Sequence, residues 1–158
     1  MALAEGTKAP SFKGQGDGGA TISLTSFKGS WLVLYFYPKD ATSGCTTEAC
    51  DFRDSMSRLS VLDVHVVGVS PDSVKSHDSF KAKFELPFAL LADTEKEVCQ
   101  AYDVWKEKSM YGRKYMGVER TTYIIDPKGK IVRVFEKVKV PGHVDAVIAA
   151  INELQGAS

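Results

Sequence analysis

The chain has 158 residues, 44% hydrophobic and 25% charged, a composition typical of one soluble globular domain over residues 1–158. Its 20 basic and 20 acidic residues give a formal charge of zero, which argues against binding to nucleic acid or to an anionic membrane surface. The longest apolar run, residues 31–37, is far shorter than the roughly 20 residues that cross a bilayer, so we expect no membrane helix.

The two ends of the chain and the cysteine count bear on the cellular location and on the oligomeric state. The first residues have neither a basic start nor a long apolar segment, so we expect no secretory signal. Three cysteines are an odd number and too few for a disulfide framework, which favours the reducing cytoplasm. No long C-terminal segment that could swap between two subunits follows Leu154, and we therefore expect a monomer.

The first half of the chain predicts a β-α-β unit. Residues 6–12 and 21–24, around a glycine-rich turn, predict short strands or an edge hairpin. The run WLVLYFY at residues 31–37 predicts a central strand buried on both faces, and residues 64–70 predict a second buried strand. Between them, apolar residues recur at helical spacing: Phe52, Met56, Leu59 and Leu62.

The second half predicts further helices and strands. Residues 70–73 should cap a helix that ends before Leu86-Pro87, followed by a short strand at 89–92. A helix should then run from Asp93-Thr94 to Val104. The charged stretch 106–115 suggests a loop near the mouth of the site.

The end of the chain predicts a hairpin and a final helix. A turn sequence, DPKGK, separates two apolar stretches at residues 121–125 and 131–135 and so predicts a β-hairpin, with Arg120 at its entry. Residues 143–154 place apolar side chains along one face, as in an amphipathic helix.

Cys45 is the candidate reactive residue, because it follows the central strand where a polar turn opens a helix. The free N–H groups and partial positive charge of a first helical turn favour thiolate over thiol. Thr42 stands three residues earlier, near enough for its hydroxyl to donate to the sulfur or to an attacked oxygen. Pro38 fixes the backbone where the strand ends, which completes the pattern P-x-x-x-T-x-x-C.

Cys50 lies five residues after Cys45. In an unbroken helix their Cα atoms are roughly 8 to 9 Å apart and rotated by about 140°. A disulfide needs Cα atoms closer than about 7 Å. Any Cys45–Cys50 bond therefore requires the first helical turns to unwind, and we expect two conformations of this segment.

The runs YFYPKDATSGCTTEAC (residues 35–50) and YMGVERTTYIIDPKGKI (residues 115–131) resemble peroxiredoxins of the bacterioferritin comigratory protein type, also called the PrxQ group. The similarity extends from Gly6 to Leu154. It implies a thioredoxin-like α/β fold, with a central mixed sheet flanked by helices and an N-terminal β extension. It also implies a thiol peroxidase that uses neither metal, haem nor flavin.

The resemblance assigns a role to each matching residue. Cys45 would be the peroxidatic cysteine that attacks a hydroperoxide, with Thr42 and Arg120 assisting and Pro38 shielding the site. Cys50 would resolve the sulfenate as an intramolecular disulfide, which a thioredoxin-type dithiol would reduce. One residue departs from the pattern T-P-G-C that is usual in these relatives: Ser43 replaces the proline, which should loosen the entry of the helix.

Several residues have plainer interpretations. Cys99, on an apolar helical face, is expected to be a core residue, and it is also the alternative resolving cysteine. Glu48 is either an ordinary helix charge or a participant in proton movement. The three histidines share no spacing that would suggest a metal site: His65, His77 and His143.

Two other functions compete with the peroxidase. A general thiol-disulfide oxidoreductase typically uses C-x-x-C, and the four residues between Cys45 and Cys50 argue against it. A redox sensor would instead expose Phe52 and nearby apolar surface to a partner when the segment unwinds. Peroxide consumption over many turnovers distinguishes the enzyme from the sensor.

Overall fold

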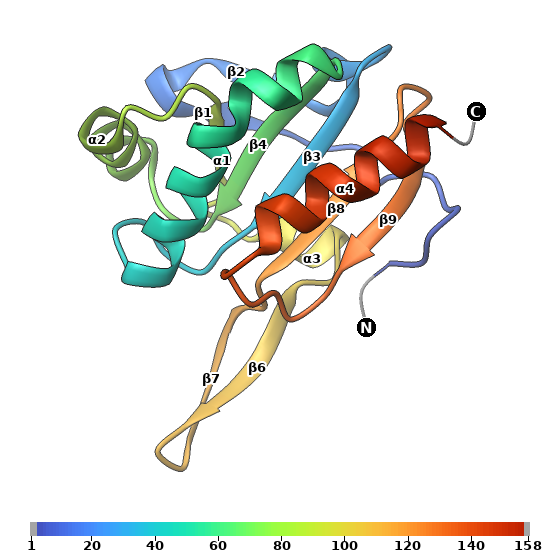
Figure 1. Cartoon of the computed structure of the whole chain (residues 1–158). Coiled ribbons are helices and arrows are strands. Elements are labelled where there is room, and N and C mark those ends of the chain that lie inside the picture. Colours follow the sequence, from blue (N-terminus) through green and yellow to red (C-terminus); the bar gives the residue numbers. More distant parts are fainter. Residues whose placement is uncertain (1–2, 157–158) are drawn as a thin grey trace.

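A seven-stranded mixed sheet organises the computed structural model, which describes residues 3–156 (Figure 1). The spatial order of its strands is β2-β1-β5-β4-β3-β8-β9. Adjacent strands β3, β4 and β5 are parallel, and the other pairings are antiparallel. The strands of this sheet are β1 (Lys13–Gly16), β2 (Thr21–Ser23), β3 (Trp31–Phe36), β4 (Val64–Ser70), β5 (Ala89–Ala92), β8 (Thr121–Ile125) and β9 (Ile131–Phe135).

Helices cover both faces of the sheet. Helices α1 (Ser43–Val61) and α4 (His143–Gly156) lie side by side on the face toward the viewer in Figure 1. They share a hydrophobic cluster with Phe80 of α2 (Val74–Phe84). The short α3 (Glu97–Ala101) packs on the opposite face together with N-terminal residues such as Phe12. The result is a central sheet with helices on either side, as the sequence predicts.

Strand β3 contributes to both hydrophobic clusters because successive strand residues point to opposite faces. Tyr35 and, just after the strand, Tyr37 belong to the cluster under α1, α2 and α4, whereas Leu34 and Phe36 belong to the cluster under α3. All four are at most 1% exposed. This confirms the central strand that the apolar run predicts. The polar loop that follows β3 leads directly into α1, so the end of a buried central strand positions the start of that helix.

Most predicted elements are confirmed. The β-α-β unit is formed by β3, α1 and β4, and β8 and β9 form the hairpin after Arg120. Ser73 caps α2 by accepting a hydrogen bond from the Ser76 N–H at 3.1 Å. An N-terminal hairpin, β1 and β2, forms at one edge of the sheet as expected, but its first strand is Lys13–Gly16 and not residues 6–12, so it starts inside the stretch expected to be a turn. Two 3-10 turns lie nearby, Asp17–Gly19 and Leu24–Phe27.

The prediction of a loop over residues 106–115 is wrong. This stretch forms a separate two-stranded hairpin, β6 (Trp105–Met110) and β7 (Arg113–Val118), which projects from the body (Figure 1). Its turn consists of Tyr111 and Gly112, both with positive φ, as a two-residue turn of type I′ requires. Because most side chains on both strands are at least partly exposed, the alternation of apolar and polar residues that marks a half-buried strand is missing.

The helix predicted from Asp93 to Val104 is much shorter than expected. The Asp93 carboxylate accepts hydrogen bonds from the N–H groups of Val98 and Cys99, at 3.1 and 2.8 Å, and so satisfies the start of α3. Lys96 and Asp103, with φ of 59° and 55°, turn the backbone on either side of the helix. Within residues 3–156, none of the helices has the length and apolar character needed to cross a membrane.

Candidate active site

Cys45 is the third residue of α1 and is 2% exposed. The first bond of the helix runs from the Thr46 N–H to the Thr42 carbonyl at 2.8 Å, so the N–H groups before Thr46 have no partner within the helix. These groups and the helix dipole place partial positive charge around the sulfur. The structure thus places Cys45 in the first turn of a helix, where the sequence predicts it.

Arg120 reaches the sulfur from the short segment between β7 and β8. Its Nη2 donates to Cys45 Sγ at 3.3 Å, and its Nη1 donates to Glu48 Oε1 at 2.6 Å. The guanidinium also lies against the first turn of α1, since a Cβ added to Gly44 would be 3.3 Å from Nη2. A side chain 75 residues away in the sequence is therefore held at the start of α1.

Glu48 is fully buried beside this guanidinium. Burial raises the pKa of Glu48 to about 7, although Arg120 acts in the opposite direction. A carboxyl group with this pKa can take up or release a proton near neutral pH. Of the two interpretations of Glu48, this favours a part in proton movement over an ordinary helix charge. Among the described residues, its second oxygen, Oε2, is buried and has no hydrogen-bond partner.

His143, at the start of α4, borders the same carboxyl group. Its Nε2 lies 2.9 Å from Thr122 Oγ1 and 4.0 Å from Glu48 Oε2. Burial, with a smaller contribution from Arg120, lowers the pKa of His143 to about 4. The ring is therefore neutral at physiological pH and is not an ionic partner of Glu48. Glu48 and His143 are 95 positions apart, and no spacing in the sequence indicates that they lie close together.

Thr42 and Pro38 lie on the loop between β3 and α1. Thr42 is the N-cap residue of α1, with extended backbone angles (φ −77°, ψ 156°). Its hydroxyl donates to the Lys39 carbonyl at 2.9 Å, and a hydroxyl has one proton to donate, so the proton is not directed at the sulfur in this conformation. Pro38 is half-buried at the bend after β3. The roles of both residues at the site remain predictions.

The remaining cysteines lie in different surroundings. Cys50 is half-buried on the same continuous helix as Cys45, and all three thiols are free. Cys99 is fully buried in the hydrophobic cluster on the opposite face of the sheet, and burial raises its pKa strongly. A Cys45–Cys99 bond would have to form through the sheet, whereas a Cys45–Cys50 bond requires only part of one helix to unwind.

One buried group near the site was missed by the sequence analysis. The loop residue Asp40 pairs with His77 of α2, with 2.7 Å between Oδ2 and Nδ1. The His77 side chain is fully buried, although the start of its helix is mostly polar. The two residues are 37 positions apart on different elements, and neither has a motif around it, so only the folded chain reveals the pair.

Comparison with known proteins agrees with the motif. The model of the AhpC/TSA family matches residues 6–134. The chain is 48% identical to Peroxiredoxin Bcp of Bacillus subtilis (98% of both chains covered) and 51% identical to a putative peroxiredoxin bcp of Coxiella burnetii (96% of this chain, 100% of the relative). The solved bacterioferritin comigratory protein of Xanthomonas campestris superposes with a TM-score of 0.88 at 42% identity, covering 97% of this chain and 98% of that one. These matches confirm the expected thioredoxin-like fold.

Proposed function

Since this chain belongs to the AhpC/TSA family, and within it to the Bcp/PrxQ peroxiredoxins, we propose that it reduces hydrogen peroxide and organic hydroperoxides through Cys45 and Cys50. Membership of the family implies a hydroperoxide substrate and a thiol reductant. The observation that carries the assignment of Cys45 is its contact with Arg120, because a permanent cation 3.3 Å from a buried sulfur stabilises a thiolate.

In the first step, the Cys45 thiolate attacks one oxygen of the hydroperoxide in line with the O–O bond. The S–O bond forms as the O–O bond breaks, sulfur is oxidised to sulfenic acid, and the departing oxygen leaves as water or an alcohol after gaining a proton. The Arg120 guanidinium stabilises the charge that develops on the oxygens. Glu48, whose pKa is about 7, is a suitable source of the proton for the departing oxygen.

In the second step, Cys50 attacks the Cys45 sulfenate and releases water, which leaves an intramolecular disulfide. The five-residue spacing on one helix requires the first turns of α1 to unwind for this step. The opposite-face position of Cys99 supports Cys50 as the resolving residue. A thioredoxin-type dithiol then reduces the disulfide and regenerates both thiols.

The substrate range includes organic hydroperoxides because a close structural relative is described for that chemistry. The Xanthomonas campestris bacterioferritin comigratory protein is described for its alkyl peroxide reduction activity. Comparing hydrogen peroxide with a small alkyl hydroperoxide in single-turnover oxidation of Cys45 measures the preference of this chain.

Mass spectrometry of the alkylated, digested protein after one equivalent of hydrogen peroxide tests the cycle. We expect a Cys45–Cys50 linkage in the wild type, no oxidation of the site in Cys45→Ser, and a Cys45 sulfenate without a disulfide in Cys50→Ser. Cys99→Ser is the matched control and should form the same linkage as the wild type. A Cys45–Cys99 linkage would overturn the assignment of Cys50.

Steady-state peroxide consumption with a thioredoxin-type dithiol completes the test. The wild type and Cys99→Ser should turn over many equivalents, whereas Cys45→Ser should not. Cys50→Ser should complete one oxidation and then stall. Consumption that stops after one equivalent in the wild type would contradict an enzyme and favour a sensor.

A further inference from the structure

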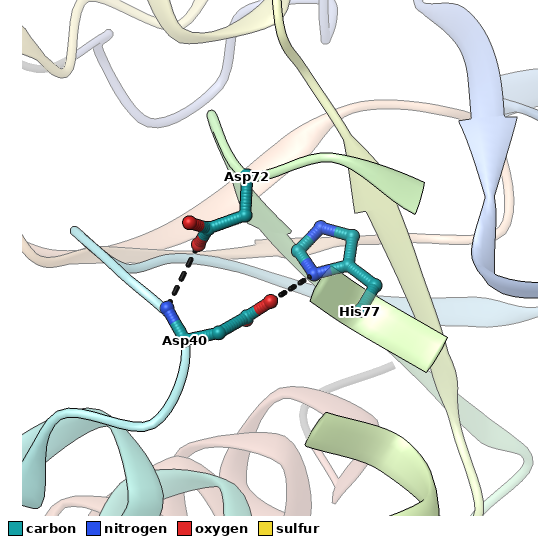
Figure 2. Close-up of side chains that lie close together, drawn as sticks. All are labelled: Asp40, Asp72 and His77. Atoms are coloured by element: carbon teal, nitrogen blue, oxygen red, sulfur yellow. Dashed lines mark hydrogen bonds and ion pairs between the residues drawn. The ribbon is translucent and has the colours of Figure 1, made fainter. Parts of the chain in front are cut away.

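The loop that leads into α1 is anchored to α2 by a buried carboxylate. Asp40 is 7% exposed and accepts three hydrogen bonds: from the Tyr37 hydroxyl at 2.6 Å, the Ser76 hydroxyl at 2.8 Å and His77 Nδ1 at 2.7 Å (Figure 2 shows the last). Three donors around one buried carboxylate favour its charged form, and they lower the pKa of Asp40 although burial opposes them.

His77 is a donor at both ring nitrogens. Its Nε2 lies 3.0 Å from the Leu91 carbonyl, which can only accept, so Nε2 carries a proton. Its Nδ1 faces the Asp40 carboxylate, so the ring is an imidazolium when Asp40 is ionised. Burial alone would lower the pKa of His77, but Asp40 and the Leu91 carbonyl raise it above its usual value. Asp40 and His77 thus form a buried ion pair.

A second contact fixes the backbone of the same loop residue. The Asp40 N–H donates to Asp72 Oδ2 at 2.8 Å, and the Ser70 hydroxyl donates to the same oxygen at 2.6 Å (the first contact is drawn in Figure 2). Oxygen and nitrogen atoms of Asp40, Asp72 and His77 lie within 4.8 Å of one another, a spacing that would suit a cation. Because both nitrogens of His77 already serve as hydrogen-bond donors, neither has a lone pair for a metal, and we interpret the group as an anchor.

The anchor sits at the boundary of the segment that must unwind. Ala41, the next residue, has φ of 63°, a conformation that is unfavourable for a residue with a Cβ and persists only where its surroundings impose it. Thr42 then caps α1, and Cys45 follows three residues later. Asp40 thus ties the loop before α1 to α2 through Ser76 and His77, and to the end of β4 through Asp72.

We propose that Asp40 and His77 are positioning residues that hold the start of α1 in its helical conformation and thereby control how often the Cys45–Cys50 segment opens. This inference rests on the two-cysteine cycle proposed above. With the pair intact, Cys45 stays beside Arg120 and ready to attack peroxide. Without it, the loop loses its attachment to α2 and the first turns of α1 open more often, which favours disulfide formation.

The pair makes the opening depend on pH. The titratable groups facing it are Tyr37 on the loop and Asp72 after β4, and Tyr37 stays protonated because burial raises its pKa. The raised pKa of His77 gives closed-state stability that is complete below its usual value of 6.5 and is lost as the pH rises through the folded-state pKa. The lowered pKa of Asp40 gives stability that is complete above 3.8 and is lost only in acid.

Hydrogen exchange of the reduced protein, measured by mass spectrometry without peroxide, tests the anchor. In Asp40→Asn and in His77→Gln we expect amides of residues 42–50 to exchange about tenfold faster, the effect of losing one charge-assisted hydrogen bond. The double variant should exchange no faster than either single variant, because the two residues act as a pair. Lys81→Gln is the matched control: it removes an ion pair to Asp17 from the same helix and should leave residues 42–50 unchanged.

The pH profile distinguishes a charged anchor from mere packing. The ratio of exchange rates between His77→Gln and the wild type should fall toward one as the pH is raised above 6.5, and the titration of Glu48 cancels in this ratio because both proteins contain it. A ratio that stays constant with pH, exchange within twofold of the wild type, or an equal effect of Lys81→Gln would overturn the proposal.

Two further measurements keep the test decisive. If His77→Gln does not fold, Ser76→Ala removes one donor to Asp40 and should give a smaller increase in the same amides, whereas no increase would overturn the proposal. After one equivalent of peroxide, Asp40→Asn should form the Cys45–Cys50 disulfide faster than the wild type. Since exchange is measured without peroxide, it reports on the anchor even if the proposed peroxidase cycle fails.

Discussion

Arg120 and Glu48 form a buried ion pair, with 2.6 Å between Nη1 and Oε1, that leaves the other terminal nitrogen of the guanidinium directed at Cys45. The Arg120 side chain is 17% exposed, and that of Glu48 is fully buried. The carboxylate thus fixes the orientation of the cation that faces the sulfur. Both partners approach from separate elements, so the pair also joins the start of β8 to α1.

Arg120→Lys tests whether this fork geometry matters. A lysine keeps the charge but cannot donate to Glu48 and Cys45 from one planar group. We expect the second-order rate constant for oxidation of Cys45 by hydrogen peroxide to fall by about a hundredfold, the cost of losing one oriented donor at a reacting oxygen. Stopped-flow measurement under single-turnover conditions gives this rate. Arg58→Lys, which alters an exposed ion pair with Asp145, is the control, and a loss below threefold in Arg120→Lys would contradict the assignment.

The raised pKa of Glu48 predicts a pH dependence of stability. Because its pKa is 4.5 in the unfolded chain and about 7 in the folded one, the folded state binds the extra proton between these values. Stability is therefore complete below pH 4.5 and is lost as the pH rises through 7, by an amount on the order of 3 kcal/mol. Urea denaturation of the wild type and Glu48→Gln across this range measures it. The difference between the two curves should shift in favour of Glu48→Gln as the pH rises, and parallel curves would refute the prediction.

Ser43→Pro tests the entry of α1. Ser43 is the first helical residue, where proline is tolerated, and Thr42 before it already has the extended backbone that proline requires. Proline restricts the unwound segment, so we expect disulfide formation after oxidation to slow by about two- to fivefold. Quenched-flow alkylation measures this rate. Ser43→Ala is the control, because it removes the serine without adding the proline ring. Equal rates of disulfide formation in the two variants would contradict the prediction that the ring slows this step.

Gly68→Ala tests the packing behind the site. A Cβ on Gly68, in β4, would lie 2.9 Å from the ring of Tyr35 and 3.0 Å from Leu90. Tyr35 is fully buried under α1 and stacks on Phe52, so it has little room to move. We expect a loss of about 1 to 3 kcal/mol in unfolding free energy, measured by urea denaturation. Gly156→Ala, with open space around it, should change stability by less than about 0.5 kcal/mol.

The sequence predicts those parts of the fold in which local pattern and burial agree. The apolar run of β3, the turn before β9 and the apolar face of α4 are all visible in the residues themselves. The β6–β7 hairpin is not visible in this way, because both strands are largely exposed and their charged and apolar residues follow no regular alternation. Four of its large apolar side chains are exposed: Met110, Tyr111, Tyr115 and Met116.

The sequence likewise predicts some residues of the candidate site and not others. Cys45 and its position at the helix start follow from the local pattern, and Arg120 was placed there through the second motif. Glu48 lies on the same helical face as Cys45, three residues on, which is a usable signal. The contacts of His143 with Thr122, and of Asp40 with His77, join elements whose packing no local pattern specifies.

Cys99 is buried on the face of the sheet opposite to α1, so its reactivity in a thiol-labelling experiment reports whether the core is intact. A water-soluble alkylating reagent meets Cys50 at the surface of α1 and Cys45 whenever that helix opens, whereas Cys99 becomes accessible only if the sheet and its helices separate. Two labelled thiols in a native sample thus report a folded chain with a functioning site, and a third marks a chain that has lost its core. Oxidative inactivation and unfolding can be told apart in one experiment.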